Sequence, residues 1–130
     1  MMEYLIGLIS TVFIVALAKF TKFEDDRSFY PTILIVIGLL YVLFAVIDGG
    51  RETILFESLI AVVFMTIAVI GSKKSQILVG IGIILHGIFD ISHPLFWENK
   101  GVPVFWAGFC SAIDVTLGAY VIWAKNRIEQ

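Results

Sequence analysis

Five apolar runs, separated by short polar breaks, account for most of this chain. Each run is about 15–20 residues long, and a helix of that length rises about 23–30 Å, close to the thickness of the hydrocarbon layer of a bilayer. His93-Pro94 is expected to end the fourth helix, because proline lacks the backbone N–H of a helix interior. The five expected transmembrane helices cover roughly residues 4–19, 30–47, 54–71, 76–92 and 104–123.

The composition fits a bilayer and excludes a water-soluble domain. Hydrophobic residues make up 59% of the chain and charged residues 15%, and the mean hydropathy is +0.97. These polar residues are too few to cover the surface of a soluble domain, and none of the runs has the wide polar stripe of a soluble amphipathic helix. We therefore predict a single all-α domain over residues 1–130, an integral membrane bundle whose main partner is the lipid bilayer.

Charge and cysteine usage exclude several other classes of protein. A formal net charge of -2 with no basic stripe argues against binding to nucleic acid. The single cysteine, Cys110, rules out a disulfide framework. The first apolar run lacks a basic segment before it and a small-residue cleavage site after it, so we expect it to be a retained helix and not a signal peptide.

The positive charges in the loops predict the orientation of the bundle. With five spans, one side of the membrane holds only Arg51 and Lys100. Cytoplasmic loops carry an excess of Lys and Arg, which predicts a cytoplasmic C-terminus and an N-terminus outside. The basic residues of the opposite, cytoplasmic side are Lys19, Lys22, Arg27, Lys73, Lys74, Lys125 and Arg127.

Small residues indicate that the last two helices pack closely together. Glycine and alanine let helix backbones approach one another, which matters in a membrane because lipid supplies no hydrophobic drive between helices. Gly108 and Ala112 form one such pair at a spacing of four residues. The other small residues in these two helices are Gly80, Gly82, Gly87, Ser111 and Gly118.

Ionisable residues inside the apolar runs are the main clue to function. His86, Asp90 and His93 are spaced i, i+4 and i+7 and share one face of the fourth helix. Asp114 lies about ten residues into the last helix, about 15 Å from its outer end and near the middle of the membrane. A charge there costs at least about 2.5–3.5 kcal/mol, so such residues usually face the bundle interior and mark a functional site.

Imidazole and carboxylate groups together suit a divalent metal such as zinc or iron. His86 and Asp90 could share an ion with Asp114, or Asp90 could do so with His93. One ion is not expected to bind all three residues of the fourth helix, because seven residues of helix rise about 10.5 Å. Glu57 and Asp48, at the outer ends of their helices, are weaker candidates for the same site.

Each candidate residue also has a purely structural interpretation. His86 and Asp114 could form a buried polar clasp between two helices without any metal. His93, beside a proline, could be an interfacial cap. Glu57 suits the first turn of a helix, where the helix dipole favours an acid. Asp48, next to two glycines, suits a turn.

Three functions remain open on this basis. An outward-facing His/Asp site could bind a divalent metal and act on a lipid or a small molecule. A proton- or ion-coupled transporter subunit could use Asp114 and His86 as a relay, and a chain this small would then need a homo-oligomer or a membrane partner protein. A non-catalytic accessory membrane protein would use the His/Asp pair as a clasp only.

Several motifs resemble those of a family of small uncharacterised bacterial membrane proteins. The resemblance spans most of the chain. It implies the membrane fold and a location in the bacterial inner membrane, and it implies no reaction. The motifs are Phe29-Tyr30-Pro31-Thr32 with the apolar residues after it, His86-Gly87-x-Phe89-Asp90-x-x-His93, and Gly101-Val102-Pro103 followed by Trp106, Phe109-Cys110 and Asp114.

Overall fold

The computed structural model describes residues 1–129, and their side chains through residue 126, so the side chain of Arg127 lies outside the described part. Within this part the chain is all-α, as the sequence predicts, and five of its helices are long and apolar enough to cross a membrane. These are α1 (Met2–Thr21), α2 (Phe29–Asp48), α3 (Arg51–Lys74), α4 (Gln76–Phe96) and α5 (Trp106–Glu129), with a short 3₁₀ helix, η1 (Phe23–Asp25), after α1.

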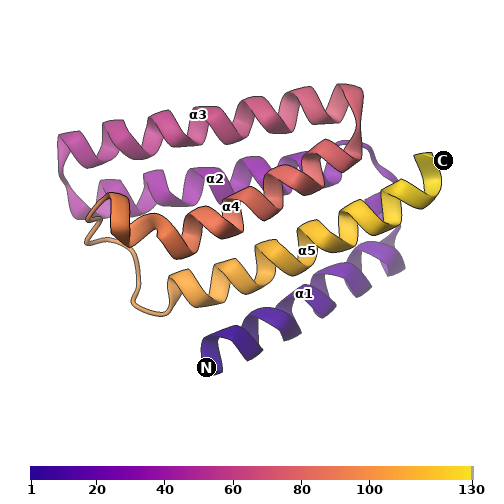
Figure 1. Ribbon diagram of the computed structural model, residues 1–130, viewed down its shortest axis with the longest axis horizontal. Coiled ribbons are helices and arrows are strands. Elements are labelled where there is room, and N and C mark those ends of the chain that lie inside the picture. The colour runs from indigo at the N-terminus through magenta and orange to yellow at the C-terminus, as the bar shows by residue number, and fades with distance from the viewer. Residues whose placement is uncertain (130) are drawn as a thin grey trace.

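The helices run side by side and reverse direction at each connection (Figure 1). α4 packs against α5, α3 and α2, while α1 lies at one edge and packs against α5. The core between them is apolar and includes Leu34, Val79, Ile83 and Leu117, each at most 1% exposed. Many large apolar side chains point outward instead, such as Phe13 at 66% exposed, which is the pattern of a bundle surrounded by lipid.

Glycines bring the backbones of α4 and α5 into contact, as the sequence predicts. A Cβ atom on Gly118 would lie 2.6 Å from the carbonyl oxygen of Gly80, closer than real Cβ atoms come. About two turns further along α4, a Cβ atom on Gly87 would lie 3.0 Å from Cβ of Asp114. The pair Gly108 and Ala112 serves a different interface. It faces α1, where a Cβ on Gly108 would lie 2.6 Å from a side-chain atom of that helix.

The expectation that Pro94 ends the fourth helix was wrong, because α4 continues through Pro94 to Phe96. Proline cannot donate to the carbonyl of Asp90, but a proline this close to the end of a helix removes only one such bond. The next turn is retained, since the N–H of Trp97 donates to the carbonyl of His93 at 3.1 Å. His93 is therefore a helical residue in register with His86 and Asp90.

A side chain at Gly118 should destabilise the bundle. We expect Gly118→Leu to lower the free energy of unfolding by at least about 2–3 kcal/mol, because the clash is with backbone that cannot move aside. Thermal unfolding of the detergent-solubilised protein measures this effect. Ala119→Leu, at the neighbouring exposed position, is the matched control and should unfold like the wild type. Equal stability of the two variants would contradict the close approach.

Candidate functional site

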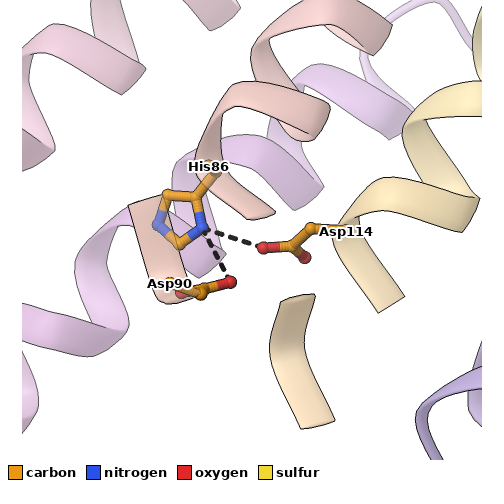
Figure 2. A group of neighbouring side chains, drawn as sticks. All are labelled: His86, Asp90 and Asp114. Atoms are coloured by element: carbon orange, nitrogen blue, oxygen red, sulfur yellow. Dashed lines mark hydrogen bonds and ion pairs between the residues drawn. The ribbon is translucent and has the colours of Figure 1, made fainter. Parts of the chain in front are cut away.

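The structure brings His86 and Asp90 of α4 together with Asp114 of α5 (Figure 2). Nδ1 of His86 lies 2.9 Å from Oδ2 of Asp114 and 3.6 Å from Oδ2 of Asp90. Each residue contributes one donor atom, and all of these atoms lie within 4.8 Å of one another. The side chains are buried, with Asp90 0% and Asp114 1% exposed. Three of the residues singled out from the sequence thus share one buried group.

Two local features position these residues. His86 and Asp90 are four residues apart, so they lie one above the other on the same face of α4. Gly87 removes the side chain that would otherwise keep α5 away, and this brings Asp114 beside His86. The i, i+4 spacing can be read from the sequence, whereas the approach of α5 depends on the packing of the two helices.

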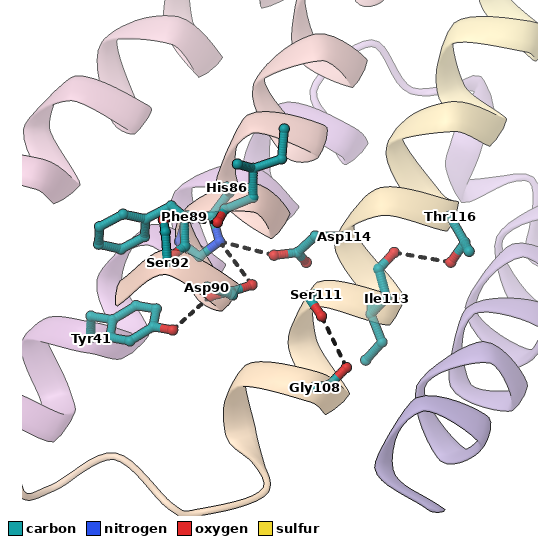
Figure 3. A network of polar contacts seen from close by, with 11 residues as sticks. Tyr41, His86, Phe89, Asp90, Ser92, Gly108, Ser111, Ile113, Asp114 and Thr116 are labelled. Carbon is teal, nitrogen blue, oxygen red and sulfur yellow. Dashed lines mark hydrogen bonds and ion pairs between the residues drawn. The ribbon is translucent and has the colours of Figure 1, made fainter. Parts of the chain in front are cut away.

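Tyr41 of α2 belongs to the same polar network, although the sequence did not single it out (Figure 3). Its hydroxyl donates to Oδ1 of Asp90 at 2.7 Å, and the side chain is buried. A signal was present in the sequence: Tyr41 carries the one polar side chain between Thr32 and Asp48. A polar atom at that depth needs a partner, and Asp90 provides it.

Some buried polar atoms of this region have no hydrogen-bond partner. Among the described residues these atoms are Oδ2 of Asp90, Nε2 of His86 and Oε2 of Glu57. Buried side-chain polar atoms normally have a partner, so each exception needs an explanation. Oδ2 of Asp90 is also the oxygen that faces Nδ1 of His86, which places an unpartnered carboxylate oxygen within the three-residue group.

His93 and Glu57 lie outside that group and form a second buried pair. Nε2 of His93 and Oε1 of Glu57 are 2.6 Å apart, and the residues are 3% and 0% exposed. The imidazole ring of His93 stacks on the ring of Tyr41, with 4.5 Å between centroids. Tyr41 therefore contacts both pairs, through its hydroxyl on Asp90 and through its ring on His93.

Asp48 is the last residue of α2, beside the turn that leads to α3 and apart from both pairs. Its two carboxylate oxygens accept hydrogen bonds from the backbone N–H groups of Gly50, at 3.1 Å, and Lys100, at 3.0 Å. This carboxylate ties the α2–α3 turn to the loop between α4 and α5. Its position matches the turn interpretation of the residue.

A cavity of about 270 Å³ lies at the end of the bundle that carries the α4–α5 loop. Asp90, Tyr41 and His93 contribute to its wall, so the buried network adjoins the cavity at this end of the bundle. His86 and Asp114 lie behind Asp90 and do not line the cavity. Besides these three residues, the lining includes Pro94, Trp97, Glu98, Asn99, Val102, Pro103, Val104 and Ala107.

The opposite end of the bundle has a separate polar network. The hydroxyls of Tyr30 and Tyr120 both donate to Oε2 of Glu24, each at 3.0 Å. Between this network and Asp114 the core of the described residues includes the apolar side chains of Leu117 and Val121, at most 1% exposed. This apolar core argues against a continuous polar path through the chain.

Comparison with known proteins identifies the family and no relative of known activity. A family model described as "Family of unknown function (DUF6010)" matches residues 2–127. No curated protein matches the chain, and no solved structure does. The family match agrees with the expected resemblance to an uncharacterised family. Because the model covers nearly the whole sequence, the chain belongs to the DUF6010 family.

Proposed function

We propose that this multi-pass membrane protein binds one divalent metal ion, zinc or iron, through His86, Asp90 and Asp114. The ion would lie behind a cavity open to the outer face of the membrane and would act there on a lipid or a small molecule. The observation that carries this proposal is the group of three buried donor atoms within 4.8 Å, one of them an unpartnered carboxylate oxygen.

Charge balance supports a cation at this position. Asp90 and Asp114 are both buried, and one imidazole ring faces them. If both carboxylates are ionised, even a protonated His86 leaves one uncompensated negative charge in a low-dielectric region, which is costly. A divalent cation neutralises both carboxylates while His86 stays neutral, the form in which imidazole binds metals.

The donor spacing also fits an ion. Around a tetrahedral ion with bonds of about 2.0–2.2 Å, neighbouring donors are about 3.3–3.6 Å apart. The distances of 2.9 Å and 3.6 Å from Nδ1 of His86 to the two carboxylates bracket that range. Three protein ligands leave one position for water or substrate, and Asp90 borders the cavity through which either would enter. A bound ion would supply a Lewis acid and activate water.

The loop charges support an orientation with the N-terminus outside and the C-terminus in the cytoplasm. In that orientation the cavity opens outward, because it lies at the end of the bundle with the fewer basic residues. We propose the bacterial inner membrane as the location, on the resemblance described above.

A structural clasp in an accessory protein is the second candidate function. One observation favours it: Nδ1 of His86 and Oδ2 of Asp114 are already 2.9 Å apart, a hydrogen bond that needs no ion. In that case Asp90 would be held by Tyr41 and the three residues would fix the register of α4 against α5. Metal content distinguishes the two candidates.

Purified wild-type protein, loaded with Zn²⁺ or Fe²⁺ and then desalted, should retain one metal ion per chain by elemental analysis. Asp90→Asn and Asp114→Asn should each lower the affinity for the metal at least about a hundredfold. Loss of an outer-shell partner lowers metal affinity about 10–100-fold, and loss of a direct ligand lowers it further. Glu52→Gln, at an exposed acid outside the group, should bind like the wild type.

The clasp predicts a different result. The wild type would then retain far less than one ion per chain, and the two Asp→Asn variants would match it in metal content. That outcome, in protein that elutes as a single folded species, would overturn the metal proposal.

The orientation can be tested with the single cysteine removed. In a Cys110→Ser background, a Lys100→Cys variant should react in intact cells with a maleimide that does not cross membranes. A Lys74→Cys variant, at the opposite end of the bundle, should react only after the cells are permeabilised. Both lysines are exposed, so access to the reagent depends on the side of the membrane. The reverse labelling pattern would invert the orientation.

A further inference from the structure

The pair formed by Glu57 and His93 has no role in the metal site, and yet His93 borders the same cavity. The carboxylate of Glu57 accepts a hydrogen bond from Nε2 of His93 at 2.6 Å. A neutral imidazole with its hydrogen on Nε2 has its lone pair on Nδ1. Glu57 therefore selects the tautomer in which Nδ1 is a hydrogen-bond acceptor.

The lone pair of Nδ1 is taken to face the cavity, because His93 lines that cavity and its other ring nitrogen, Nε2, faces Glu57. Among the described residues, Nδ1 of His93 is not one of the fully buried polar atoms that lack a hydrogen-bond partner. The hydrogen bond between this ring and Glu57 is made by the other nitrogen, Nε2. The ring is held between Tyr41, on which it stacks at 4.5 Å, and Phe89, which it meets edge-on at 5.2 Å. A molecule in the cavity would meet Nδ1 of a fixed imidazole.

The other polar groups of the cavity also favour hydrogen-bond donors. Asp90 and Glu98 bring carboxylates to its wall. Among the described residues that line the cavity there is no Lys or Arg. The lining would repel an anion and bind a group that donates hydrogen bonds.

We propose that this cavity is a binding site for a small neutral or cationic molecule carrying hydroxyl or amino groups. His93, positioned by Glu57, accepts a hydrogen bond from that molecule through Nδ1. None of these contacts involves a bound ion, so the proposal goes beyond the metal site and is tested on chelator-treated protein.

The first test is labelling with diethyl pyrocarbonate, which acylates an accessible unprotonated imidazole nitrogen. The chain has two histidines, so peptide mass spectrometry distinguishes them. We expect His93 to react faster than His86, which does not line the cavity. Glu57→Gln should slow the labelling of His93 roughly fivefold, because it removes the charge-assisted hydrogen bond that holds the ring in the tautomer with an unprotonated Nδ1.

Two further variants separate access from positioning. Ala107→Phe adds a ring at the cavity wall and should also slow the labelling of His93, while leaving the pair with Glu57 unchanged. Glu52→Gln, at an exposed acid outside both the cavity and that pair, should leave the rate as in the wild type. Ala107→Phe keeps the proposal testable if Glu57→Gln does not fold.

The second test addresses the charge of the ligand. In Cys110→Ser protein, neutral iodoacetamide should alkylate His93 faster than the anion iodoacetate, by a larger factor than for free histidine. Glu98→Gln should narrow that difference, because it removes one of the repelling carboxylates. An iodoacetate rate equal to or above that of iodoacetamide would overturn the ligand class.

The labelling experiment can also overturn the site itself. If His93 stays unlabelled in the native protein but reacts once the protein is denatured, Nδ1 is sealed and the cavity does not present it. If folded Glu57→Gln protein is labelled at the wild-type rate, Glu57 does not position the ring. Neither result affects the metal proposal, which depends on metal content.

Discussion

The energetic cost of a carboxylate surrounded by hydrocarbon is the constraint on which this structure depends. Glu57, Asp90 and Asp114 are all at most 1% exposed in a bundle whose outer surface is apolar. Each of them faces an imidazole or a phenol, so the polar groups gather along one line inside the bundle. The charged residues that α3, α4 and α5 bury are the ones that meet partners on a neighbouring helix.

α4 organises this line of polar groups. Three of its residues, four and three positions apart, reach α5, α2 and α3 in turn: His86 meets Asp114, Asp90 meets Tyr41, and His93 meets Glu57. Because α4 continues through Pro94, the last of these residues keeps its place on the shared face. The helix that packs against three others is thus also the helix that joins the two acid–imidazole pairs.

The two pairs differ in what they can do, although their chemistry is alike. His86 faces two carboxylates and lies behind the cavity, an arrangement suited to holding a cation. His93 faces one carboxylate and lies on the cavity wall, an arrangement suited to receiving a hydrogen bond from a bound molecule. Tyr41 lies between them and fixes the position of each, by its hydroxyl on one side and its ring on the other.

The sequence by itself determined the all-α membrane bundle and its five spans, because apolar run length and hydropathy depend only on the order of residues. It also placed His86, Asp90 and His93 on one face of a helix, since that follows from helical periodicity. Only the tertiary structure decided which carboxylate each histidine meets, that Tyr41 joins them, and that Gly108 serves α1. Those contacts depend on how helices distant in the chain approach and rotate, and periodicity within one helix carries no information about its neighbour.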